Sequence, residues 1–139
     1  MKTIRIMLLG LLFTTFLFSG SNAQVQYHYF DAFDEVRVGY RWQRANILQR
    51  NSDAVLNLEL VNQREVAVEV RFTVGFYRDQ MLILENSDNK LCLKPGQSRR
   101  GVRGDLRYSA AGINMEMTEK EWFSWDVFDV EVTEVEGCD

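Results

Sequence analysis

The chain has 139 residues, 16 Lys and Arg against 20 Asp and Glu, a formal net charge of −4, and 46% hydrophobic residues. This length suits one domain. The apolar content excludes a disordered chain, and the acidic balance argues against a general nucleic-acid binder. Because the sequence contains a single His, we expect neither His-based catalysis nor a His-rich metal site, and we expect no cofactor.

The first 23 residues have the pattern of a secretory signal peptide. Lys2 and Arg5 form a positive region before an apolar run over residues 6–18, and small residues occupy the −3 and −1 positions, Ser21 and Ala23, before Gln24. The run is shorter than the roughly 20 residues that cross a bilayer, which argues against a membrane anchor. We therefore predict cleavage before Gln24, export to the periplasm or the extracellular space, and no membrane span in the mature chain.

Cleavage would leave residues 24–35 as an N-terminal lead segment and residues 36–139 as the folded domain. Loss of 23 residues from 139, with Lys2 and Arg5 among them, leaves 116 residues and a net charge of −6. In an oxidising compartment two cysteines favour a disulfide, so we predict a Cys92–Cys138 bond. Two free thiols or an intermolecular bond are the alternatives.

Most of the remaining chain shows the two-residue period of β-strands. Apolar side chains alternate with other residues at 36–42, 56–60 and 66–76. Polar residues 62–65 and 78–80 predict hairpin turns, residues 86–89 predict a polar loop, and Pro95-Gly96 predicts a turn. Shorter strands are expected at 81–84 and 91–93, and a weaker one at 102–108.

The last third of the chain changes its pattern twice. Residues 110–121 lack alternation, and Thr118 to Glu121 match a capping box that predicts one helical turn. Within residues 122–135 the apolar phase slips between Val127 and Phe128, which predicts a β-bulge or a strand that changes sheets. About seven short strands with almost no helix predict an all-β, antiparallel β-sandwich, with a small closed barrel as the alternative.

The pattern resembles the immunoglobulin-like β-sandwiches of small exported Gram-negative bacterial proteins. The resemblance covers residues 36–135 and rests on the strand that ends at Leu60-Val61-Asn62, the long strand at 66–77, and the turn Leu93-Lys94-Pro95-Gly96-Gln97-Ser98. It implies an immunoglobulin-like fold of about seven strands. No functional residue is transferred, because a fold does not determine a function.

Two segments carry most of the charge contrast. Arg99, Arg100, Arg103 and Arg107 form a local basic cluster, whereas residues 116–139 contain nine acidic residues and one Lys. The arginines are candidates to hold an anionic partner such as a phosphate or an acidic glycan. Alternatively, the charges occupy solvent-facing strand positions that discourage edge-to-edge pairing, or the two segments face each other.

Aromatic residues are the second candidate feature. Trp42, Trp122 and Trp125, together with five Tyr, are candidates for stacking against a sugar. Because Trp122 and Trp125 are three positions apart, a regular strand would point them to opposite faces, one into the core and one toward solvent.

Two further motifs are weaker. Arg103-Gly104-Asp105 matches an integrin-binding tripeptide, but it lies inside a predicted strand. The acidic groups at residues 31–35 and 126–129 match no calcium loop, since calcium takes six to eight oxygen ligands.

These observations favour a non-enzymatic, exported interaction module that binds a protein or a cell-surface polymer. A small carbohydrate-binding protein with an exposed aromatic platform is the alternative, and a carboxylate-based hydrolase is a weaker one. A long unpaired edge strand with apolar side chains would favour binding by strand addition. The sequence carries no indication of an oligomeric state.

Overall fold

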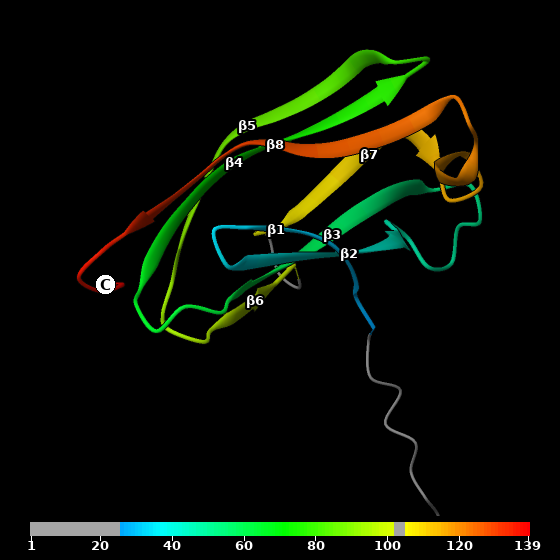
Figure 1. Cartoon of the computed structure of the whole chain (residues 1–139). Helices are drawn as coiled ribbons and strands as arrows, with labels where there is room; N and C mark the ends of the chain where they lie inside the picture. The colour runs from blue at the N-terminus through cyan, green and yellow to red at the C-terminus, as the bar shows by residue number, and fades with distance from the viewer. Residues whose placement is uncertain (1–25, 102–104) are drawn as a thin grey trace, which may run out of the picture.

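The computed structural model describes residues 26–101 and 105–139 and shows two antiparallel sheets packed face to face (Figure 1). The all-β sandwich predicted from the sequence is confirmed, with eight strands where about seven were expected. Sheet A has the order β1-β2-β3, and the far side of β3 pairs with both β6 and β7. Sheet B has the order β5-β4-β8. The strands are β1 (His28–Phe33), β2 (Val36–Arg44), β3 (Asp53–Asn62), β4 (Val68–Arg78), β5 (Met81–Leu93), β6 (Ser98–Arg100), β7 (Arg107–Asn114) and β8 (Phe123–Glu134).

The core lies between the inner faces of β3 and β4, as the alternation of residue types predicts. Leu56, Leu58 and Leu60 point inward from β3, while Val70 and Phe76 do so from β4; each is at most 2% exposed. On the opposite, outer face of β3 the polar side chains of Asn57 and Glu59 are also buried. This second, polar layer contains the candidate site described below.

The turn predicted at residues 62–65 is not a hairpin, because β3 and β4 belong to different sheets. Their apolar faces must meet across the core, so the chain crosses over at this corner. Asn62, fully buried, holds the corner: its Nδ2 donates to the carbonyl oxygens of Val66 at 2.8 Å, Lys94 at 3.1 Å and Leu93 at 3.3 Å. The second predicted hairpin is correct, with Asp79 and Gln80 in the left-handed region between β4 and β5.

The predicted short strands at 81–84 and 91–93 are one continuous strand, β5, and the polar stretch between them is not a loop. Irregularities in the β4–β5 register show how the strand accommodates it: Phe72 pairs with Asn89, and Val74 already pairs with Asn86. The residues between form a bulge around Asp88, whose φ is 61°. Sequence periodicity breaks at such a bulge although hydrogen bonding to the neighbouring strand continues.

The strand expected at 102–108 is observed only in part: residues 102–104 lie outside the described residues, residues 105–106 form a turn, and Arg107 and Tyr108 begin β7. β6 ends at Arg100 and β7 begins at Arg107. Leu58 of β3 spans this interruption: its carbonyl accepts from the Gly101 N–H, and its N–H donates to the Leu106 carbonyl, both at 2.9 Å. Leu58 therefore connects the end of β6 with the start of β7 along the edge of β3.

The remaining predictions on the C-terminal third are mostly confirmed. A bulge in β8 lies where the phase slips, and Asp129 there has a φ of 50°. One helical turn is present as a 3-10 helix, η1 (Met117–Glu119), but the capping box is not formed, because Glu116 is the N-cap and makes no side-chain cap bond. The Cys92–Cys138 disulfide is present, with Cα atoms 5.6 Å apart. Such bonds are typical of proteins outside the reducing cytosol.

Two predictions concern the N-terminal 35 residues. The predicted signal peptide, residues 1–23, lies outside the described residues. The predicted lead segment contains β1, which pairs with β2 through a tight turn with Asp34 and Glu35 in the left-handed region. In the described part of the chain, no helix is long and apolar enough to cross a membrane.

Candidate functional site

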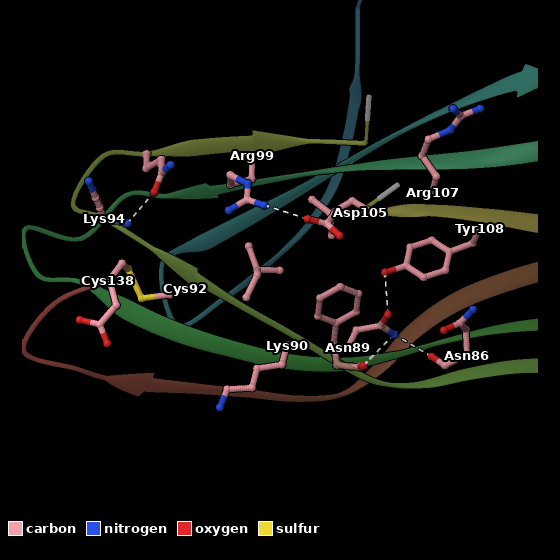
Figure 2. A pocket seen from close by; sticks show the side chains of 15 residues that line it. Asn86, Asn89, Lys90, Cys92, Lys94, Arg99, Asp105, Arg107, Tyr108 and Cys138 are labelled. Atoms are coloured by element: carbon pink, nitrogen blue, oxygen red, sulfur yellow. Dashed lines mark hydrogen bonds and ion pairs between the residues drawn. A yellow bond between two sulfur atoms is a disulfide. The ribbon is translucent and has the colours of Figure 1, made fainter. Parts of the chain in front are cut away.

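The predicted arginine cluster is divided between two sides of sheet A. Arg99 pairs with Leu60 and so faces inward at the sheet edge, where its Nη2 lies 3.1 Å from the Asp105 carboxylate. Arg100 and Arg107 lie on the outer face, opposite Glu59 and Asn57 of β3. Figure 2 shows the Arg107 side chain directed away from the interior residues beside it. The fourth member of the cluster and the glycine of the Arg-Gly-Asp motif, residues 103 and 104, lie outside the described residues.

The arginines do not pair with the acidic C-terminal segment among the described residues. Glu116 instead pairs with Arg50 at 3.5 Å, and Glu134 pairs with Arg64, which also lies 3.8 Å from Glu35. These pairs are partly or fully exposed, so each contributes at most about 1 kcal/mol.

The outer face of sheet A carries a cluster around a buried carboxylate. Glu59 is 2% exposed and accepts hydrogen bonds from Arg100 Nε at 2.6 Å, Tyr29 OH at 2.7 Å and Ser98 Oγ at 2.8 Å. Strand register explains the convergence: Tyr29, Gly39, Glu59 and Arg100 form one row across β1, β2, β3 and β6. Gly39 has no side chain in this row, which leaves room for the Tyr29 ring.

The surroundings of Glu59 favour its charged form. Burial by itself raises its pKa, but the hydrogen bonds from Arg100, Tyr29 and Ser98 outweigh burial and hold the pKa of Glu59 below its usual value. The hydrogen bond to Glu59 in turn raises the pKa of Arg100. Glu59 is therefore a structural anion that organises the face, and its hydrogen-bond partners leave it poorly placed to accept a proton from a substrate.

The three tryptophans do not form an exposed, coplanar platform: Trp42 packs against Trp125, and Trp122 packs against Phe123. Trp42 contacts the rings of Phe76, Phe123 and Trp125, and its plane is 86° from that of Trp125. The Arg78 guanidinium lies over the Trp122 ring, with its Cζ 4.5 Å from the ring centroid. All three are half-buried against the core, so the prediction that Trp122 and Trp125 divide between core and solvent is wrong. Trp122 lies in the turn immediately before β8, so the alternation of a regular strand does not apply to it.

A cavity of about 570 Å³ lies at the open side of the sandwich between β5 and the β6–β7 edge (Figure 2). Asn89 bridges the two sheets there: its Oδ1 accepts from Tyr108 OH at 3.0 Å, and its Nδ2 donates to the carbonyls of Asn86 and Phe72. Burial, and then the nearby Asp105 charge, raise the pKa of Tyr108. Among the described residues, no three His, Cys, Asp or Glu side chains are placed to hold a metal ion.

A second hollow lies farther along the same open side and is apolar. It has a volume of about 150 Å³ and is lined by Phe76, Ile83, Leu84, Ala110, Ala111 and Ile113. It adjoins four consecutive apolar residues of β5, Met81 to Leu84, which are 39–69% exposed. The sequence predicts a strand over these four residues. Their lack of alternation and of charge is the sequence signal that this strand does not have one buried and one exposed face.

Comparison with known proteins gave no match: no family model, no curated protein and no solved structure is detectably similar to the chain.

Proposed function

We propose that the protein is an exported, non-enzymatic binding module with an immunoglobulin-like sandwich, and that it binds an extended apolar segment of a partner protein along the edge strand β5. The observation that carries the proposal is the exposed apolar run at the start of β5. The Cys92–Cys138 bond supports export, because disulfides persist in oxidising compartments.

The edge position of β5 supports strand addition. Among the described strands β5 pairs with β4 alone, so its other side presents unpaired backbone N–H and C=O groups. Proteins usually protect such an edge with charged residues, prolines or strong bulges. The stretch from Met81 to Leu84 contains neither a charge nor a proline, and of the three protections it has only a one-residue bulge at Ile83. An extended peptide placed there would satisfy the backbone groups and cover the apolar side chains.

The local geometry adds a place for a partner side chain. The β4–β5 register pairs Phe76 with Leu84 and Tyr77 with Leu82, so Ile83 is an extra residue in β5. A bulge of this kind turns two neighbouring side chains toward one face, and both Ile83 and Leu84 line the apolar hollow. A hollow of about 150 Å³ suits one apolar side chain of a bound segment.

Site-specific photocrosslinking in the native host tests the proposal. A photoreactive amino acid replaces Ile83 in one variant and Leu48 in the control, since Leu48 is 94% exposed but lies in the β2–β3 loop. We expect a crosslinked protein from position 83 and none from position 48. The backbone amides of residues 81–84 should also exchange more slowly with solvent in the complex.

Two results would contradict the proposal. Crosslinking at both positions to the same abundant proteins would show non-specific contact. Crosslinking of position 83 only to a second copy of the chain, with a dimer in sedimentation, would show that β5 serves self-association. An Ile83→Lys variant provides the matched loss of function, and because Ile83 is 46% exposed we expect this variant to fold.

A further inference from the structure

The outer face of sheet A concentrates positive charge in a chain that is acidic overall. Arg37 and Arg41 of β2 lie on this face with Arg100 and Arg107, and Glu59 is the one carboxylate in the rows that these residues form. Glu59 is already bound by Arg100. Arg37, Arg41 and Arg107 make no ion pair with any residue that the structure describes. We call these four arginines the arginine face.

Strand register brings two of the arginines to either side of a buried amide. Arg41, Asn57 and Arg107 pair directly across β2, β3 and β7. Since neighbouring strands are about 4.8 Å apart, the two arginine Cα atoms are separated by about 10 Å. Two guanidinium groups at that spacing repel each other in the free protein and can approach a common oxyanion from opposite sides.

The amide between them has unused hydrogen-bonding capacity. Asn57 is fully buried, and its Nδ2 donates to the carbonyl oxygens of Arg41 and Val55. Its Oδ1 is buried without a donor among the described residues. An unpaired buried acceptor costs about 1–3 kcal/mol. Because Asn57 has no exposed surface, it separates the two arginines in the row and is not itself a ligand contact.

Tyrosine rings complete the face. Tyr27 is 8% exposed, with the guanidinium carbons of Arg100 and Arg41 at 5.6 and 6.0 Å from its ring centroid. The Arg37 guanidinium lies 3.7 Å from the centroid of Tyr29. These rings hold the arginine side chains in place, which lowers the entropy lost when a ligand orders them.

We propose that the arginine face binds an acidic polysaccharide that carries sulfate or phosphate groups. Arg41 and Arg107 bind the oxyanion from the two ends of the row that they share. A polysaccharide fits better than a lipid surface because the exposed aliphatic side chains lie elsewhere, at residues 47–48, 66 and 81–84. The proposal is independent of strand addition at β5, since the two surfaces lie on different sheets.

Binding of fluorescently labelled dextran sulfate to the full-length mature protein tests this proposal, with uncharged dextran as the matched probe. We expect dextran sulfate to bind, binding to weaken as salt rises, and dextran not to bind. The double variant Arg41→Gln/Arg107→Gln should bind about 100-fold more weakly, at about tenfold for each charged contact. The control Arg50→Gln/Arg71→Gln removes the same charge from two exposed positions elsewhere and should bind within about twofold of the wild type.

Other outcomes overturn the proposal. Equal weakening in both double variants would show that only net charge matters. Binding to phosphatidylglycerol vesicles without binding to dextran sulfate would assign the face to a membrane surface. Inorganic sulfate serves as a competitor, with chloride at equal ionic strength as its control. If excess sulfate displaces no more dextran sulfate than chloride does, the face does not recognise the oxyanion. A shift of the Arg41 and Arg107 Nε–H signals in NMR spectra on binding would place the oxyanion between these two side chains.

Discussion

Replacement of both cysteines by serine should destabilise the domain by an amount that the fold makes calculable. The bond joins Cys92 at the end of β5 to Cys138, and the residues are 46 positions apart. A cross-link that closes a loop of this length lowers the entropy of the unfolded chain by an amount worth about 4 kcal/mol near room temperature. Most residues after Glu134 are exposed, so few native contacts depend on the bond. The effect therefore arises mainly in the unfolded state.

Urea unfolding of the oxidised protein, the reduced protein and the Cys92→Ser/Cys138→Ser variant measures this contribution. We expect the reduced protein and the variant to agree with each other and to unfold about 4 kcal/mol more easily than the oxidised protein. Their m-value should be larger, because an uncrosslinked chain exposes more surface when it unfolds. A loss under about 1 kcal/mol, or an unchanged m-value, would refute the unfolded-state explanation. Truncation after residue 136 is the control, and it should cause the same loss as the serine variant.

Three further predictions concern single side chains. Glu59→Gln should lower the free energy of unfolding at neutral pH and have no effect on it in acid. The native pKa of Glu59 is lowered, so the stabilisation by its charge is present above the unfolded pKa of about 4.3 and disappears as pH falls through the native pKa. Unfolding experiments on both proteins at several pH values measure this difference. Gly75→Ala should cost about 1–3 kcal/mol in the free energy of unfolding, because the new Cβ would lie 2.8 Å from the Phe128 ring; an unchanged urea midpoint would contradict this. Tyr108→Phe should cost about 1–3 kcal/mol and speed amide exchange in β5, because Asn89 Oδ1 loses its donor; normal exchange there would show that the bridge is unimportant.

Bulges affected the prediction of β5 and β8 in opposite ways. In β8 the slip between Val127 and Phe128 was visible, because apolar residues continue on both sides of the bulge. In β5 the bulge around Asp88 consists of polar residues, which have the same composition as a loop. Backbone pairing with β4 keeps this segment in the sheet, and that pairing leaves no local sequence pattern.

The amino-acid sequence by itself determined the strand-rich fold class, the inward-facing side chains of β3 and β4, and the cysteine pair. These features follow from alternation of residue type and from the count of cysteines, both of which are local or countable. Only the tertiary structure decided which strands share a sheet, and therefore which distant side chains meet. Arg41 and Arg107 are 66 positions apart in sequence, yet they flank Asn57 because β2 and β7 both pair with β3. The exposed apolar run of β5 is likewise a candidate binding surface only because β5 lies at a sheet edge. That position depends on the order of the strands and not on the residues of β5 alone.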